Sequence, residues 1–293
     1  MSNELAAFSN YLASAVEWAG RSVVAVHARP RFSSSGAIWR PGVIVTAEHT
    51  IRREDEITVT LPDGSNQPAT LAGSDAGTDL AVLKLANPSG EPVKQGAAET
   101  RPGHLALSVG RSEDSGVNAT MGIVSAVSGS WRTWRGGRLD QYIRLDLTMY
   151  PSSSGSLVID TSGAALGIAT SALSRIAGVA IPSSTVNRVL DEILARGHVR
   201  RGYLGVGLQP VELPDHQKGL IVLSVEAEGP AAKAGALIGD ILVSLGAKTV
   251  ADTDDVQAAL EASGVGKTIE AGVLRGGERK HLTITIGERP RRN

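Results

Sequence analysis

The first twenty residues carry apolar side chains at a helical spacing. These side chains recur every three or four positions, at Leu5, Phe8, Tyr11, Leu12, Ala15 and Ala19. The spacing places them on one face of an amphipathic helix of about fifteen residues. We therefore expect residues 1–20 to form a helix. It either packs on its own domain or contacts another copy of the chain, a role that suits the aromatic residues Phe8, Tyr11 and Trp18.

From Arg21 onward the pattern changes to short apolar runs that are punctuated by Gly, Ser, Pro and Asp. These runs predict strands at Ser22–Val26, Gly42–Val45, Ile57–Leu61, Leu80–Leu85, His104–Val109, Gly122–Val127, Tyr142–Asp146, Ser156–Ile159, Ala165–Thr170 and Gly178–Ile181. Many short strands without helices between them indicate a barrel or a sandwich. A stretch of about 160 residues suits two small antiparallel barrels packed together.

A second helical pattern follows Pro182. Ser183 or Ser184 is in position to cap this helix, and Gly197 lies where a glycine commonly ends one. The apolar stripe of the helix consists of Val186, Val189, Leu190, Ile193 and Leu194. We expect residues 184–198 to be a helix that connects two domains.

A second domain is predicted over residues 199–289. Its apolar runs predict strands at Leu204–Leu208, Leu220–Val225, Ile241–Leu245, Thr268–Leu274 and Lys280–Ile286. A short helix is expected after Gly229, and a longer one is expected to begin near Thr253. This combination is typical of a compact α+β module, and residues 290–293 are expected to be a disordered tail.

Composition narrows the classes of function. The chain has 293 residues, with 29 Lys and Arg against 30 Asp and Glu, and this net charge of −1 argues against a nucleic-acid partner. The absence of cysteine excludes disulfides, thiolate metal sites and cysteine nucleophiles. No run of about 18 apolar residues occurs, so no transmembrane segment is expected.

The beginning of the sequence does not resemble a signal peptide. It lacks a basic first region, and Glu4 and Glu17 interrupt its apolar stretch. The sequence as written therefore predicts a cytoplasmic protein. If the start is a processed or recloned one, a periplasmic or other extracytoplasmic location is predicted instead.

Three residues are candidates for nucleophilic catalysis. Ser154 lies in a turn of small residues that leads into a strand, a setting that exposes a hydroxyl beside backbone N–H groups. His49 follows an apolar strand and could act as a base. Asp79 opens an apolar strand, where its carboxylate needs a partner such as a histidine. Each residue taken alone also has an ordinary structural explanation.

Taken together and in this order, these residues resemble the HtrA branch of the chymotrypsin-like serine proteases. The resemblance rests on Thr46-Ala47-Glu48-His49, on Asp79-Leu80-Ala81-Val82-Leu83-Lys84, on Pro151 to Gly155, on Gly167 to Thr170 and on Gly178 to Ser183. In the second domain, Arg201 to Val206, Gly229 to Gly235 and Gly239 to Leu242 resemble a PDZ domain. The resemblance implies a mostly β fold, with a chymotrypsin-like double β-barrel over residues 21–183 and one α+β PDZ domain.

The resemblance also implies a mechanism. His49 would accept the proton of Ser154, Asp79 would orient the imidazole, and the backbone N–H groups of Ser152 and Ser154 would form the oxyanion hole. This chemistry needs no metal and no cofactor.

Substrates and partners follow from the same resemblance. The substrate pocket is expected to be neutral and apolar, formed by Thr148, Ile168, Ala169, Thr170, Val179, Ala180 and Ile181. Such a pocket favours cleavage of unfolded proteins after small or medium apolar residues. The PDZ domain would bind C-terminal peptides, with the carboxylate on the amides of Leu204, Gly205 and Val206 and the last side chain between Val256 and Leu260. Val256 and Leu260 could instead belong to the core. A homotrimer is expected, held by the N-terminal helix.

The nucleophile segment departs from the family pattern. Ser152 and Ser153 stand where the family has glycine and asparagine, and a glycine turns its N–H inward more easily. Two functions therefore remain open. One is an HtrA-type serine endopeptidase. The other is a pseudoprotease that acts as a chaperone or a peptide-binding scaffold.

Overall fold

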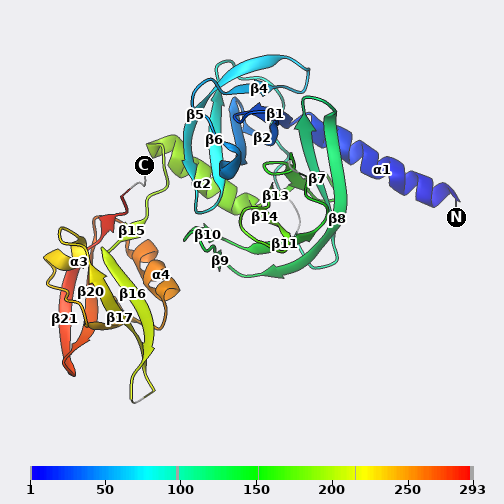
Figure 1. Cartoon of the computed structure of the whole chain (residues 1–293). Coiled ribbons are helices and arrows are strands. Elements are labelled where there is room, and N and C mark those ends of the chain that lie inside the picture. Colours follow the sequence, from blue (N-terminus) through cyan, green and yellow to red (C-terminus); the bar gives the residue numbers. More distant parts are fainter. Residues whose placement is uncertain (1, 97–98, 151, 215, 291–293) are drawn as a thin grey trace. The chain divides into compact units, whose positions relative to one another are not determined.

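The chain forms two compact units, residues 1–199 and residues 200–293. The computed structural model describes residues 2–96, 99–150, 152–214 and 216–290 (Figure 1). The sequence interpretation of a disordered tail concerns residues 290–293, of which 291–293 lie outside the described residues. None of the described helices has the length and the apolar character needed to cross a membrane.

The first six strands close into a β-barrel. They pair in the order β1-β2-β3-β6-β5-β4, and β4 returns to β1. Their bounds are Val23–His27 (β1), Ser34–Arg40 (β2), Val43–Ala47 (β3), Thr58–Thr60 (β4), Asn66–Asp75 (β5) and Leu80–Leu85 (β6). The sequence analysis did not predict β2, which opens with two serines, or β5, which contains a proline and several polar residues.

A second barrel follows in the order β11-β14-β13-β12-β7-β8. Its strands are Leu105–Ser112 (β7), Gly116–Ser128 (β8), Tyr142–Asp146 (β11), Leu157–Ile159 (β12), Ala165–Thr170 (β13) and Gly178–Pro182 (β14). Between β8 and β11 lies a small hairpin of β9 (Trp131–Arg132) and β10 (Arg138–Leu139). The two barrels confirm the predicted chymotrypsin-like architecture.

Helix α1 (Ser2–Gly20) confirms the predicted N-terminal helix. Only its C-terminal half packs on the barrels, where Leu12, Ala15 and Val16 contact the core. Leu5, Phe8 and Tyr11 are exposed, and the N-terminal part of the helix extends away from the barrels (Figure 1). The structure thus leaves an apolar face of this helix uncovered.

Helix α2 (Ser183–Arg196) belongs to the first unit and is packed against it. The Trp39 indole N–H donates to the Asn187 side chain at 2.7 Å, which fixes the helix to β2. The prediction of a serine cap is wrong, because the hydroxyl of Ser183 donates to the Ala165 carbonyl at 2.7 Å. Gly197 ends the helix in a left-handed conformation, as expected.

The second unit is one antiparallel sheet with two helices, as predicted. The sheet order is β16-β17-β18-β20-β21, with β19 on β18 and a separate β15–β22 pair. The strands are Gly202–Tyr203 (β15), Val206–Glu212 (β16), Lys218–Val225 (β17), Ile241–Leu245 (β18), Lys248–Thr249 (β19), Thr268–Arg275 (β20), Glu278–Thr285 (β21) and Gly287–Glu288 (β22). Helix α3 spans Pro230–Lys233, and α4 spans Thr253–Ser263 behind a capping box formed by Asp252 and Asp255.

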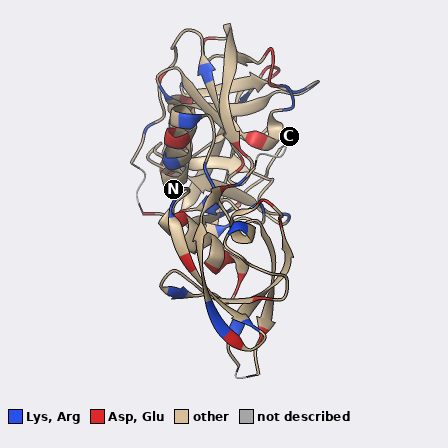
Figure 2. Ribbon diagram, turned by 90° about the vertical axis from the view of Figure 1, so that its left-hand side faces the viewer, with Lys and Arg blue, Asp and Glu red and all other residues tan. Residues whose placement is uncertain are grey.

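A buried ion pair joins Asp240, directly before β18, to Arg275 at the end of β20. The carboxylate of Asp240 is 1% exposed and accepts two hydrogen bonds from the Arg275 guanidinium, at 2.7 and 2.8 Å. The hydrogen bonds from Arg275 hold the pKa of Asp240 below its usual range. Elsewhere, Figure 2 shows basic and acidic residues interspersed along the ribbon, which fits the near-zero net charge.

We predict that this pair makes the second unit sensitive to acid. A carboxyl whose folded pKa is lowered contributes stability above its unfolded pKa of about 3.9, and this stability is lost as the pH falls through the folded pKa. The variant Asp240→Asn should therefore be less stable at pH 7, and its stability should depend less on pH between about 5 and 2. Calorimetry of the full chain measures this difference. The exposed Glu228→Gln serves as the control, and equal pH slopes for Asp240→Asn and the unchanged chain would contradict the prediction.

Candidate active site

Asp79 is the most buried member of the candidate triad. It precedes β6, and its side chain is fully buried. Its backbone has φ +58°, a left-handed conformation that aspartate tolerates better than most residues. The Asp79 carbonyl accepts the Glu48 N–H at 3.0 Å. The loop of Asp79 and the loop of His49 are therefore joined through the backbone.

His49 lies in a short 3-10 helix, η1 (Glu48–Thr50), directly after β3. Its Nδ1 lies 3.0 and 2.9 Å from the two carboxylate oxygens of Asp79, and its backbone N–H donates to the same carboxylate at 2.9 Å. An ionised carboxylate can only accept, so Nδ1 carries the proton. The lone pair of Nε2 is therefore available to accept a proton. The His49 side chain is 24% exposed.

Thr170 supplies a further hydrogen bond to Asp79, from the second barrel. Its hydroxyl donates to Oδ2 of the carboxylate, and the residue is completely buried at the end of β13. The sequence interpretation placed Thr170 in the substrate pocket. The structure instead makes it a partner of the carboxylate.

Ser154 lies in the loop between β11 and β12 and is 3% exposed. Its hydroxyl is 3.2 Å from the hydroxyl of Ser171, the residue that follows Thr170. Among the hydrogen bonds of the described residues, none joins Ser154 to His49. The structure therefore pairs His49 with Asp79 directly. Ser154 contacts Ser171, the neighbour of the Thr170 whose hydroxyl bonds to Asp79.

The loop of Ser154 is held by backbone and hydroxyl contacts. The Ser152 carbonyl accepts the Ser35 hydroxyl at 3.0 Å, and the Ser153 hydroxyl accepts the Tyr150 N–H at 3.0 Å. Gly155 has φ +87°, and a Cβ there would lie 2.1 Å from the Ser35 carbonyl oxygen. Only glycine permits this close approach of the loop to β2.

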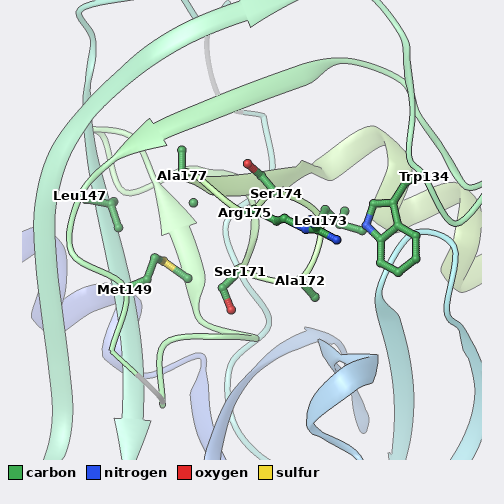
Figure 3. A pocket seen from close by; sticks show the side chains of 10 residues that line it. Trp134, Leu147, Met149, Ser171, Ala172, Leu173, Ser174, Arg175 and Ala177 are labelled. Atoms are coloured by element: carbon green, nitrogen blue, oxygen red, sulfur yellow. The ribbon is translucent and has the colours of Figure 1, made fainter.

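A cavity of about 830 Å³ lies next to Ser171 (Figure 3). Its lining is mainly apolar and consists of Trp134, Leu147, Met149, Ser171, Ala172, Leu173, Ser174, Arg175, Ala177 and Gly178. Figure 3 shows the Leu147 and Met149 side chains on one side and Trp134 on the other. The shared residue Ser171 places this cavity beside the Ser154 hydroxyl.

The seven residues that the sequence analysis assigned to a pocket do not line this cavity. Six of them are fully buried in the second barrel, namely Ile168, Ala169, Thr170, Val179, Ala180 and Ile181. Thr148 is exposed, whereas its neighbours Leu147 and Met149 face the cavity. In an extended segment alternate side chains point to opposite sides, so an assignment shifted by one residue selects the wrong face.

Glu48 and Arg135 form an ion pair at 3.5 Å beside the histidine. Burial raises the pKa of the Glu48 carboxyl, the nearby charge of Asp79 raises it further, and Arg135 opposes both effects. Arg135 lies on the β9–β10 hairpin. The same hairpin reaches the loop before Asp79, because the Thr133 hydroxyl donates to the Gly77 carbonyl at 2.7 Å. This hairpin thus braces the loops of both His49 and Asp79.

In the second unit, the proposed carboxylate loop forms a tight turn between β15 and β16. Gly205 has φ +76°. The carbonyls of Leu204 and Gly205 accept hydrogen bonds from Ala231 and Glu226, both at 2.8 Å. Val206 begins β16.

The two residues expected to line the peptide groove are covered. Val256 and Leu260 on α4 are 3% and 1% exposed and belong to the core of the unit. Their burial agrees with the other interpretation of the sequence, in which Val256 and Leu260 are core residues.

Comparison with known proteins places these features in families. Residues 34–168 match the family described as a trypsin-like peptidase domain, and residues 202–286 match the PDZ domain family. A probable periplasmic serine endoprotease, DegP-like, of Brucella suis is 34% identical over 280 residues. That alignment covers 90% of this chain and 54% of the relative, so the chain spans about half the length of this curated relative.

Solved structures cover the chain more completely. The HtrA-type protease AlgW with a decapeptide superposes with a TM-score of 0.82 at 28% identity, over 96% of this chain and 99% of that one. The serine endoprotease from Yersinia pestis has a TM-score of 0.80 at 30% identity, over 94% and 97% of the two chains. A further AlgW structure, with a tripeptide, is 31% identical and is covered over 98% of its length. The trypsin-like double barrel and the following PDZ domain agree with these structures along the chain, which therefore belongs to the HtrA-type serine proteases.

Proposed function

We propose that the chain is a serine endoprotease with Ser154 as nucleophile, His49 as base and Asp79 as the orienting acid. The observation that carries the proposal is the hydrogen bond between Nδ1 of His49 and the carboxylate of Asp79. This bond directs the basic Nε2 away from the buried acid. The relatives are named endoproteases, and they give no support to the alternative of a pseudoprotease scaffold.

The reaction would begin with a change of partner for the Ser154 hydroxyl. In the structure this hydroxyl bonds to Ser171 at 3.2 Å, and in the proposed substrate complex it bonds instead to Nε2 of His49. Hydrogen bonds of catalytic groups commonly tighten only in the substrate complex. His49 then accepts the hydroxyl proton as the oxygen attacks the peptide carbonyl, and later donates this proton to the leaving amine.

The developing oxyanion needs donors that are already in place. We assign this role to the backbone N–H groups of Ser152 and Ser154. The hydrogen bonds of the Ser152 carbonyl and of the Ser153 hydroxyl support the assignment, because they fix the loop between the two donors.

The cavity beside Ser171 would hold the substrate side chain before the scissile bond. Leu147, Met149, Leu173 and Ala177 make it apolar, so the proposed substrate residue is small or medium-sized and apolar. Such residues are mostly buried in folded proteins. The proposed substrates are therefore unfolded or misfolded chains, which suits a role in protein quality control.

The second unit would capture a free C-terminus. The turn of Leu204, Gly205 and Val206 supplies backbone N–H groups, and a peptide could add as a strand along β16. The AlgW structures with peptides support this proposal by analogy. Because Val256 and Leu260 are covered, capture is expected to require a local opening of α4.

Assembly and location are proposed from the helix and the relatives. The exposed Leu5, Phe8 and Tyr11 on α1 support a homotrimer held by this helix. The relatives are named periplasmic, and they support an extracytoplasmic location; the cytoplasmic interpretation of the sequence finds no support in them.

Removal of the Asp79 charge should nearly abolish turnover. Asp79→Asn keeps the size of the side chain and its tolerance of positive φ, but it stabilises the wrong histidine tautomer. We expect kcat to fall about 10⁴-fold with a small change in KM. The exposed Asp114→Asn is the control. A fall of less than about tenfold would contradict the assigned role.

Cleavage of an unfolded protein tests the proposed activity directly. Casein incubated with the chain should give fragments that end mainly in apolar residues, as identified by mass spectrometry. Ser154→Ala removes the nucleophile and should abolish the fragments, while the exposed Ser130→Ala should not. Cleavage that persists in the Ser154→Ala protein would exclude this serine as the nucleophile.

The second unit should distinguish a free C-terminus from a blocked one. A peptide that ends in an apolar residue with a free carboxylate should bind at least tenfold more tightly than its amidated form, since amidation removes the charge-assisted bonds to backbone N–H groups. Isothermal titration with the paired peptides measures this ratio. Equal affinities would refute the assignment of the Leu204–Val206 turn.

A further inference from the structure

We propose that Ser35 is a positioning residue for the oxyanion loop. Ser35 lies on β2 of the first barrel, 119 positions before Ser154, and its hydroxyl reaches the loop of the second barrel. The inference rests on the proposed protease function and adds a residue that the mechanism does not contain.

The Ser35 side chain is completely buried and its hydroxyl is shared between two backbones. The hydroxyl donates to the Ser152 carbonyl at 3.0 Å and accepts the Arg111 N–H at 3.1 Å. A hydroxyl has only one proton to donate. We assign this proton to the Ser152 carbonyl, because the alternative acceptor, the Arg111 carbonyl, lies farther away at 3.4 Å. Ser35 thus links β7 to the loop of the nucleophile.

The anchor on β7 is itself rigid. The guanidinium of Arg111 donates to the Val23 carbonyl at 2.9 Å and to the Gly20 carbonyl at 3.1 Å. The neighbouring Gly110 provides the space for the hydroxyl, because a Cβ there would lie 2.4 Å from Ser35 Oγ. The position of the Ser35 oxygen is therefore set by strand β7 and the end of α1.

This hydrogen bond fixes one complete peptide group of the loop. The carbonyl of the peptide between Ser152 and Ser153 bonds to Ser35, and the N–H of the same peptide donates to the Tyr150 carbonyl at 2.9 Å. A peptide group is planar, so two bonds on opposite sides determine its orientation. The two proposed oxyanion donors, Ser152 N–H and Ser154 N–H, lie directly before and after this group.

Loss of the Ser35 hydroxyl would release the carbonyl side of that peptide. The loop would then sample other orientations, and the oxyanion donors would spend less time in place. Donors of this kind act mainly in the transition state. The expected effect is a fall in kcat of about tenfold without a matching change in KM, which is smaller than the 10²–10³-fold effect of deleting a donor.

The chain offers a matched control at the next position. Ser34 is also completely buried on β2, and its hydroxyl has no hydrogen-bond partner among the described residues. Ser34→Ala and Ser35→Ala each remove one buried hydroxyl from the same strand. A general effect of strand β2 would appear in both variants, whereas a positioning effect appears only in Ser35→Ala.

The kinetic test compares the unchanged chain, Ser34→Ala and Ser35→Ala. It measures turnover of a peptide substrate and inhibition by a peptide boronate, whose tetrahedral adduct with the serine needs the oxyanion hole. We expect Ser35→Ala alone to lower kcat and to weaken boronate inhibition by a similar factor. If the alanine variant does not fold, Ser35→Cys is used instead, because a thiol fills the site and is only a weak hydrogen-bond donor. An unchanged kcat, or an effect on KM only, would overturn the inference.

A second measurement does not depend on activity. Hydrogen exchange of a peptide that contains Ser152–Ser156 should be several-fold faster in Ser35→Ala than in Ser34→Ala and in the unchanged chain. Equal exchange in all three proteins would overturn the role of Ser35. If the unchanged chain does not cleave casein, the proposed function fails, and the exchange result still decides whether Ser35 holds the loop.

Discussion

The first unit depends on one constraint, which is that the buried carboxylate of Asp79 has no access to water. Burying an unpaired carboxylate costs several kcal/mol, so the fold must supply donors to Asp79. It does so from two places, with the backbone and ring of His49 in the first barrel and the hydroxyl of Thr170 in the second. The hydrogen bond from Thr170 joins the two barrels at this acid. The carboxylate that receives this bond also orients the histidine.

The sequence was sufficient for the two barrels, the PDZ-type module and the order of the candidate triad, because these depend on apolar runs and on short motifs. It was insufficient for β2, whose first residues are serines with no apolar alternation. The reason is physical, since Ser35 is buried for its hydrogen bonds and not for its hydrophobicity. A pattern of hydrophobic positions gives no sign of these first residues, although Ala37, Ile38 and Trp39 farther along β2 are apolar and buried.

The pocket shows a different limit of sequence reasoning. Ile168, Ala169 and Val179 are apolar and close to the site in sequence, but all three are buried inside the barrel. The cavity is built instead from segments outside the regular strands, at Leu147, Met149 and Leu173. Strand residues of a closed barrel are needed to fill it. The side chains that meet a substrate therefore come from loops, whose conformation short motifs do not determine.

The nucleophile loop is held by hydrogen bonds at Ser152 and Ser153. Ser152 contributes its backbone carbonyl, which a glycine would also have, whereas Ser153 contributes its side chain. The Ser153 hydroxyl accepts the Tyr150 N–H, and the Ser156 hydroxyl donates to the Ser153 carbonyl at 2.6 Å. The Ser108 hydroxyl on β7 then bonds to Ser156 at 2.5 Å. The loop is thus fastened to β7 directly through Ser108 and indirectly through Ser35, so its geometry follows from how strand β7 is seated between the two barrels.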